Sequence, residues 1–157
     1  MKNNLLLYFS KTGNTRFIAN RISQKWNCEV KEIKCPIQSI GFLFFLSALN
    51  WKIRTNIKKG DIEPYSEVLV MGPIWGGKVI SPLRSVLKKC RSCEKLTHFA
   101  VTCESREEYK NDKYGFGGVL KNAQSILGPR AGKMAAFSTA LVAPEGYEPS
   151  QIGRAHV

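Results

Sequence analysis

The chain has 157 residues, which is enough for a single domain with a substantial hydrophobic core. Lys and Arg number 24 against 12 Asp and Glu, giving a formal net charge of +12. The basic residues are scattered and show neither zinc-knuckle spacing nor an aromatic-basic RNA motif, so we expect a solvated basic surface and no nucleic-acid partner.

The cysteines and the N-terminus indicate the compartment. The five cysteines are odd in number, and no charged segment followed by a signal-type apolar core precedes them. No apolar run approaches the roughly 20 residues that a membrane-spanning helix needs. We therefore expect a cytoplasmic protein with reduced thiols and no transmembrane helix.

The first predicted elements are a strand and a helix. Leu5 to Phe9 is an uninterrupted apolar run, typical of a central strand covered on both faces. From Thr15 onward, Ile18, Ile22 and Trp26 recur at four-residue spacing. This period predicts an amphipathic helix of about three turns.

The next segment is predicted as an edge strand followed by a long helix. Residues 28 to 33 alternate between apolar and charged positions, which indicates a strand near the sheet edge, parallel to the first. Pro36 is suited to opening a helix, and residues 37 to 58 then contain no proline. We expect one helix here that covers the sheet and has a solvated basic end. The alternative is peripheral membrane contact through residues 40 to 59, where aromatic and cationic side chains lie together.

The remainder of the chain repeats the strand-helix unit. Further strands are predicted at 68 to 72, 99 to 103 and 134 to 138, with helices from Ser81 or Pro82 to Lys89 and from 117 to 126. Such alternation predicts an α/β fold with a doubly wound, five-stranded parallel sheet in the order 2-1-3-4-5. Because five strands come with only four helices, we expect the final helix to be missing.

The last residues differ in character from the rest. Residues 152 to 157 resemble the translation of a widely used sequencing-adapter oligonucleotide, and the regular pattern stops after Pro149. We expect this tail to be non-native, and one domain, incomplete at its C-terminus, to span residues 1 to 151.

A candidate phosphate loop joins the first strand to the first helix. It reads Ser10-Lys11-Thr12-Gly13-Asn14-Thr15. An anion at this point meets free backbone N–H groups and the positive end of the helix dipole, while three hydroxyls are available as donors. A Walker loop and the three-glycine dinucleotide fingerprint are both absent, which favours the phosphate of a mononucleotide.

The loop resembles the phosphate loop of the flavodoxin family, whose pattern Ser/Thr-x-Thr-Gly-x-Thr occupies the same place. A second segment, after the third strand, resembles the loop that contacts the flavin ring in flavodoxin-like proteins. Its residues are Pro73, Ile74, Trp75, Gly76, Gly77 and Lys78, with Ser81-Pro82-Leu83 following. The two motifs together imply a flavodoxin-like fold and noncovalently bound FMN, with Trp75 offering a face for stacking.

The resemblance also implies a third loop, after the fourth strand, that closes the other side of the ring. Its candidate residues are Cys103, Glu104, Ser105, Tyr114, Gly115, Phe116 and Gly117. An aromatic side chain would supply the second stacking face, and the glycines would allow close backbone approach.

The resemblance implies electron transfer through FMN to a redox partner protein or a small-molecule electron acceptor. Family electron carriers are commonly acidic, so this basic chain keeps the alternative of an NAD(P)H- or quinone-linked FMN reductase, membrane-associated or not. A third hypothesis is a cofactor-free interaction module. Cys90 and Cys93 have the spacing of a redox dithiol, but they lie at a predicted helix C-terminus and are expected to be ordinary thiols.

Overall fold

The computed structural model describes residues 3–11, 13–75, 77–103, 116–138 and 155–156. The helices and strands in chain order are β1 (Asn4–Tyr8), α1 (Asn14–Trp26), β2 (Cys28–Glu32), α2 (Ile40–Ala48), α3 (Lys59–Ile62), β3 (Glu67–Pro73), α4 (Ser81–Ser92), β4 (Leu96–Cys103), α5 (Phe116–Leu127), the 3-10 turn η2 (Gly128–Arg130), β5 (Ala131–Ser138) and β6 (Ala155–His156).

The predicted sheet is confirmed. Five parallel strands are arranged in the order β2-β1-β3-β4-β5, with Asn4 of β1 opposite Cys28 of β2 on one side and Glu67 of β3 on the other. The prediction did not include the two-residue strand β6, which pairs antiparallel with β5 at the sheet edge. The predicted missing helix would follow β5, and residues 139–154 lie outside the described part of the chain.

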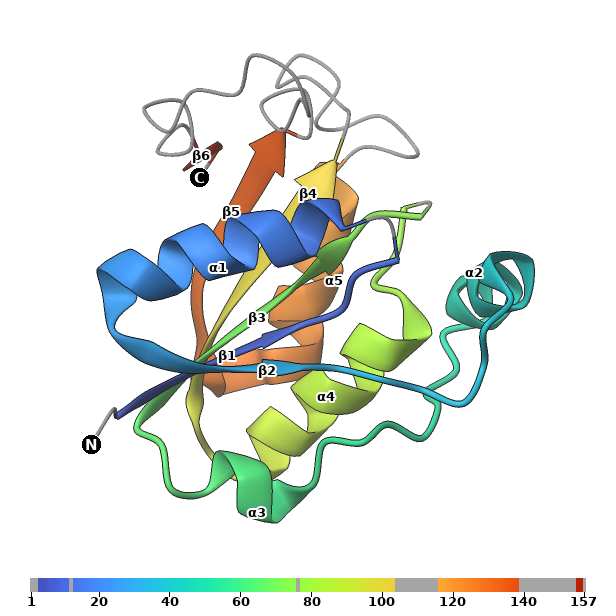
Figure 1. Cartoon of the computed structure of the whole chain (residues 1–157). Helices are drawn as coiled ribbons and strands as arrows, with labels where there is room; N and C mark the ends of the chain where they lie inside the picture. The colour runs from blue at the N-terminus through green and yellow to red at the C-terminus, as the bar shows by residue number, and fades with distance from the viewer. Residues whose placement is uncertain (1–2, 12, 76, 104–115, 139–154, 157) are drawn as a thin grey trace, which may run out of the picture.

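The sheet separates two cores. The larger one is formed by α4 and α5 against one face of the sheet and includes Leu7, Val70, Leu83 and Phe99. The smaller one lies under α1 on the opposite face, as Figure 1 shows. Strands buried on both sides explain why the sequence shows apolar runs in place of alternation.

His98 is part of the sheet architecture. Its Nε2 lies 3.0 Å from a Glu67 carboxylate oxygen, and the backbone N–H of Lys133 donates to its Nδ1 over 2.9 Å. Because Nδ1 accepts, the ring proton of the neutral histidine is on Nε2 and points to Glu67. A Cβ at Gly132 would lie 2.4 Å from Nδ1, so this position requires glycine for the ring to fit. His98 thus connects β3, β4 and β5.

The long helix predicted for residues 37 to 58 is wrong. The helix in this region, α2, begins after Ser39, whose side chain accepts from the Phe42 N–H, and ends at Ala48. Asn50 adopts a left-handed conformation with φ of +58°, which asparagine tolerates better than most residues and which breaks a helix. The chain then runs without helix to Lys58, held by bonds such as Asn56 N–H to Lys34 O at 3.0 Å.

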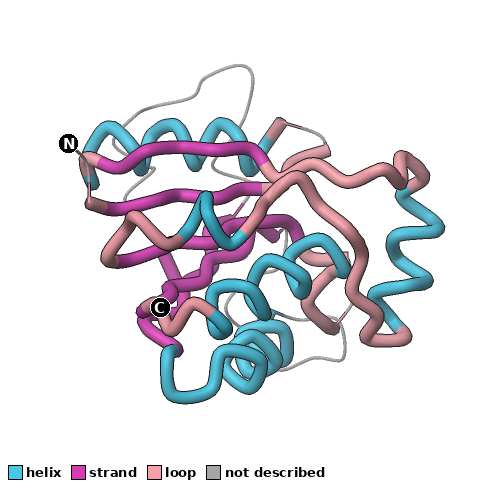
Figure 2. The backbone as a smooth tube through the Cα atoms, turned by 90° about the horizontal axis from the view of Figure 1, so that it is seen from below, coloured by secondary structure: helices cyan, strands magenta, loops and turns pink. Residues whose placement is uncertain are grey.

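The expectation that this helix covers the sheet is also wrong. Helices α4 and α5 cover this face of the sheet, and α2 packs on α4 at the side of the molecule. Figures 1 and 2 show α2 standing apart from the sheet in both views. Only Leu43, Leu46 and Ser47 of α2 are buried.

Candidate functional site

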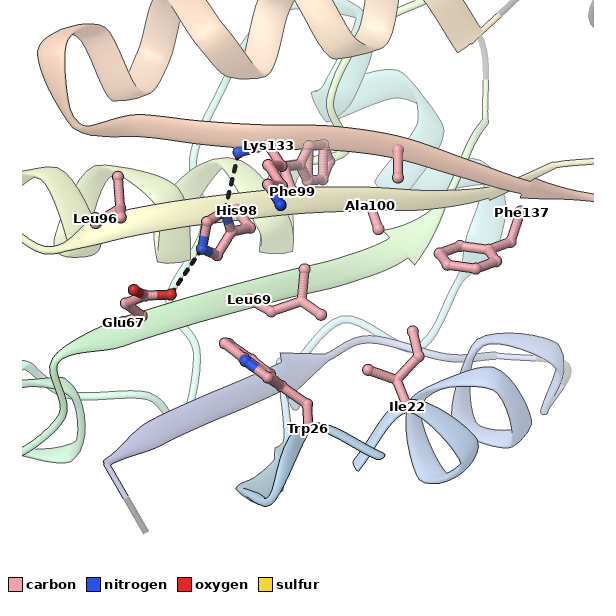
Figure 3. A pocket seen from close by; sticks show the side chains of 11 residues that line it. Ile22, Trp26, Glu67, Leu69, Leu96, His98, Phe99, Ala100, Lys133 and Phe137 are labelled. Carbon is pink, nitrogen blue, oxygen red and sulfur yellow. Dashed lines mark hydrogen bonds and ion pairs between the residues drawn. The ribbon is translucent and has the colours of Figure 1, made fainter. Parts of the chain in front are cut away.

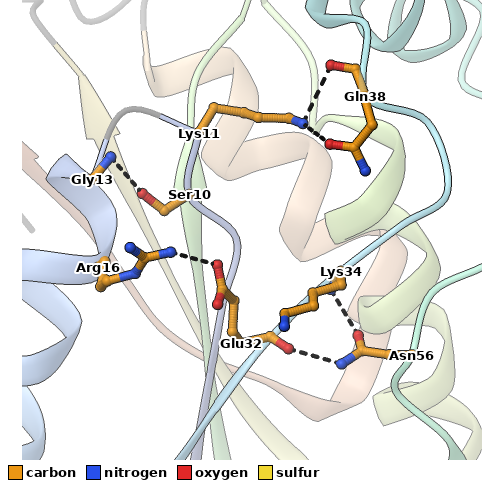
Figure 4. Close-up of polar contacts among 8 residues, drawn as sticks. All are labelled: Ser10, Lys11, Gly13, Arg16, Glu32, Lys34, Gln38 and Asn56. Atoms are coloured by element: carbon orange, nitrogen blue, oxygen red, sulfur yellow. Dashed lines mark hydrogen bonds and ion pairs between the residues drawn. The ribbon is translucent and has the colours of Figure 1, made fainter.

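The predicted phosphate loop lies at the carboxyl end of β1, and α1 begins at its far side. Gly13 is the N-cap residue of α1 with φ of +94°, a conformation that favours glycine. Its N–H donates to Ser10 Oγ over 3.0 Å, which closes the turn (Figure 4). In the described part of the loop no side chain caps α1, and its first turn contains no acidic residue. The N–H groups at this helix end are therefore available to an anion.

Two basic residues, Lys11 in the loop and Arg16 directly after it, are directed toward the β2 side. Lys11 Nζ donates to the backbone oxygen of Gln38 at 3.3 Å and to its Oε1 at 3.2 Å. Arg16 pairs with Glu32 at 2.8 Å, and this carboxylate raises the pKa of the Arg16 guanidinium further. Figure 4 shows both contacts. These cations contribute long-range positive potential near the loop.

Thr15 is buried and bonded to a residue that the sequence analysis missed. Its Oγ1 lies 2.8 Å from Oγ1 of Thr102, and both residues are almost fully buried. Thr102 is near the carboxyl end of β4, opposite Pro73 of β3. The contact links the start of α1 to the carboxyl end of β4. Its only sequence signal is a hydroxyl residue next to Cys103, at the end of a predicted strand.

The predicted ring loop begins at the end of β3 and lies beside the phosphate loop. The Ile74 N–H donates to Thr102 O over 3.3 Å, which anchors the loop to β4. Trp75 is half-buried and meets Phe9 edge-on, with ring centroids 5.9 Å apart and an interplanar angle of 77°. The sequence predicts Phe9 as the last residue of the first strand. In the structure Phe9 follows β1 and supports the Trp75 ring.

Lys78 of the predicted ring loop is directed toward helix α2. Its Nζ donates to Ala48 O over 3.1 Å, at the C-terminal end of α2. The favourable charge at that helix end accounts for the contact. The lysine thereby joins the ring loop to α2.

The third predicted loop is described only at its two ends. Cys103 and Phe116 are buried in the larger core, and Gly117 is buried in the first turn of α5. A Cβ at Gly118 would lie 3.4 Å from Gly77 O, so the ring loop and the start of α5 are adjacent. Glu104, Ser105, Tyr114 and Gly115 lie outside the described residues, as do Thr12 and Gly76. The Phe116 ring is part of the core.

The remaining candidate chemistry is sparse. Across the described residues, no three His, Cys, Asp or Glu side chains form a group that could hold a metal ion. Burial raises the pKa of the Cys90 thiol to about 12, so this cysteine is protonated at neutral pH. None of the described helices has the length and apolarity needed to cross a membrane.

Comparison with known proteins identifies the fold. Neither the protein-family models nor the curated proteins contain a match to this chain. Among solved structures, a flavoprotein from Lactobacillus acidophilus in complex with FMN is similar over 88% of this chain and 93% of its own, with 16% identity and a TM-score of 0.64. A Fusobacterium nucleatum flavodoxin bound to FMN is similar over 94% of this chain and 75% of its own, with 16% identity and a TM-score of 0.52.

A third similarity shows the same fold inside a larger protein. The rubredoxin:oxygen oxidoreductase of Desulfovibrio gigas matches 96% of this chain with 33% of its own, at 12% identity and a TM-score of 0.55. The chain therefore has a flavodoxin-like fold. The predicted phosphate and ring loops lie at the carboxyl ends of β1 and β3, the switch point where open α/β sheets place their ligands.

Proposed function

We propose that this chain binds FMN noncovalently and transfers electrons through it to a redox partner protein or a small-molecule acceptor. The observation that carries the proposal is the uncapped N-terminus of α1 beside the half-buried Trp75. An anion-binding helix end and an aromatic face next to it suit a molecule with a phosphate at one end and a flat ring at the other. The FMN-bound structures with the same fold support this choice.

The chain's own residues would bind and orient the cofactor. Backbone N–H groups in the first turn of α1, from Asn14 onward, would hold the phosphate, and the Thr15 hydroxyl could add a donor while it stays bonded to Thr102. Trp75, held by Phe9, would take one face of the ring, and the Gly77 backbone would lie near its edge. FMN itself supplies the redox chemistry.

Asn14→Asp tests the proposal. A carboxylate in the first turn of α1 favours the helix dipole but repels a phosphate, so the melting temperature should be unchanged or higher. The dissociation constant for FMN, measured by quenching of flavin fluorescence, should rise at least tenfold. Riboflavin, which has no phosphate, should bind both proteins equally.

Asn20→Asp is the matched control. It is the same substitution at an exposed position in the middle of α1, away from the helix N-terminus. It should leave FMN affinity within about twofold. The proposal fails if the purified protein binds no FMN after reconstitution, or if Asn14→Asp weakens riboflavin and FMN alike.

A reductase is the second candidate function, favoured by the net charge of +12, which departs from the acidic surface common in the family's electron carriers. Lys78 joins the predicted ring loop to the exposed helix α2. A lipophilic acceptor such as a quinone would reach the ring from this side. Anaerobic titration separates the two functions. A carrier accepts electrons stepwise and turns over little NAD(P)H, whereas a reductase oxidises NAD(P)H rapidly when a quinone is added.

A further inference from the structure

Helix α2 and the residues just after it present an apolar surface to solvent. Six large side chains, here called the α2 patch, are 44% to 58% exposed: Ile40, Phe42, Phe44, Phe45, Leu49 and Trp51. The rings of Phe42 and Phe45 stack with centroids 6.3 Å apart. Outside this patch, Leu96 is the one large hydrophobic residue of comparable exposure among the described residues. A contiguous exposed patch of this kind marks an interaction surface.

The patch is exposed because its inner side is firmly anchored. Ser47 Oγ accepts from the Ser81 N–H over 2.9 Å and donates to Leu43 O over 2.6 Å, so α2 is tied to the start of α4. Leu43 and Leu46 fill the space between these helices. A helix that is apolar on every side needs an apolar environment on every side. The protein supplies one for the inner side only.

A basic groove lies beside the patch. It is a cavity of about 490 Å³ between the chain after α2 and the last turns of α4. Its cationic lining residues are Lys52, Arg54, Lys59, Lys88 and Lys89, and no acidic residue lines it. The sequence carries no Asp or Glu from residue 33 to residue 60. Lys89 is held by Ile57 O, while the described part of the chain gives Lys52, Arg54, Lys59 and Lys88 no ion pair.

Charge and composition together select the occupant. Aromatic side chains next to Lys and Arg, with Trp51 directly before Lys52, match the apolar and headgroup layers of a bilayer surface. A second copy of the chain fits poorly, because a two-fold contact through the patch would bring two basic grooves together. Anionic headgroups neutralise the groove while the acyl layer covers the rings.

We propose that the α2 patch and the basic groove form a peripheral docking site for a bilayer that contains anionic phospholipids. The aromatic side chains enter the boundary between headgroups and acyl chains, and headgroup phosphates occupy the groove. The site uses none of the residues that would bind FMN, so this inference and the proposed function can fail independently.

Vesicle co-sedimentation with the full chain tests this proposal. The protein should bind vesicles of phosphatidylcholine with 30% phosphatidylserine and bind pure phosphatidylcholine much more weakly, with affinity falling as salt rises. Lys52→Glu with Arg54→Glu should weaken binding at least tenfold. Lys25→Glu, which changes an exposed charge at the end of α1, should weaken it less than threefold.

The apolar contribution needs its own pair of variants. Phe45→Ser with Trp51→Ser should abolish sedimentation with anionic vesicles, whereas Leu96→Ser, exposed outside the patch, should not. Phe45, Trp51 and Leu96 are all exposed, so the variants should keep the fold. A thermal melt followed by circular dichroism checks this. Brominated lipids should quench the tryptophan fluorescence of the wild type and of Trp26→Phe, but not that of Trp51→Phe.

Three results would overturn the proposal. The first is no binding to anionic vesicles by the folded wild type. The second is equal loss of binding in Lys25→Glu and in the groove variant. The third is a stable dimer in sedimentation equilibrium that Phe45→Ser with Trp51→Ser dissociates, because the patch would then be an interface between copies.

Discussion

The hydroxyl groups of Thr15 and Thr102 meet 2.8 Å apart, and either oxygen can be the donor. If Thr102 donates, the hydrogen of Thr15 remains available for a phosphate oxygen. If Thr15 donates, the pair is a structural link between α1 and β4 and nothing more. The two hydroxyls are buried, so removing one leaves the other without its partner.

We therefore expect Thr15→Val and Thr102→Val each to lower the free energy of unfolding by about 1–2 kcal/mol. The double variant should cost little more than either single one, because two apolar groups of the same shape replace a bonded pair. Urea denaturation measures all three. Thr97→Val, at the other end of β4, is the control and should be additive with Thr15→Val. Additivity of Thr15→Val with Thr102→Val would show that the hydroxyls do not interact.

At the scale of elements, α2 shows where a pattern is ambiguous. Its apolar residues predict a helix, and a helix is present, but a run that is apolar on all sides does not indicate which side is buried. The end of the helix depended on Asn50 in a left-handed conformation. Asparagine costs less than about 1 kcal/mol inside a helix, so its presence alone does not mark a helix end. The contact of Ser47 with Ser81, 34 residues away, decided which side faces the protein.

The short helix α3 provides a pH-dependent test. The Asp61 carboxylate accepts from the Lys58 N–H over 2.8 Å and pairs with Lys31 at 3.0 Å, and these contacts lower the pKa of Asp61. A pKa that is lower in the folded chain means that the carboxylate stabilises the fold above its unfolded pKa. This contribution is lost as the pH falls through the folded pKa.

Asp61→Asn should thus lower the free energy of unfolding at pH 7 by about 0.5–1 kcal/mol, since the group is partly exposed. The difference from wild type should begin to shrink as the pH falls through the ordinary aspartate pKa of about 3.9, and it should be lost as the pH falls through the lower pKa of the folded chain. Glu63→Gln, which also removes a carboxylate at α3, is the control. Thermal melts between pH 2.5 and 7 measure the effect, and a difference that does not shrink between pH 5 and pH 2.5 would contradict it.

At the scale of the whole molecule, the two faces of the sheet are covered unequally. Helices α4 and α5 cover one face, while among the described residues α1 is the helix on the other. A groove of about 570 Å³ lies beside α1 and is open to solvent. Figure 3 shows Ile22 and Trp26 of α1 on one side, with Leu69, Ala100 and Phe137 of the sheet along it.

This groove should bind the apolar dye ANS in the native protein, because its lining is mainly apolar. Phe137→Ser in the groove and Phe45→Ser in the α2 patch should each lower the dye's emission, and the double variant should show the sum. The sites lie on different sides of the molecule and share no residue. If the native protein does not enhance the emission of ANS, or if Phe137→Ser leaves that emission unchanged, the groove is covered in solution.

The sequence alone was sufficient for the strand order, the strand-helix alternation and the place of the Ser10 to Thr15 segment between β1 and α1. Apolar runs, four-residue spacing and the Ser10 to Thr15 motif are local, and buried parallel strands allow few arrangements. Only the tertiary structure revealed the Thr15–Thr102 bond, the Phe9–Trp75 contact and the outward face of α2. These depend on which surfaces meet after folding. A hydroxyl or an aromatic ring has the same local pattern whether its partner lies 87 residues away or is absent.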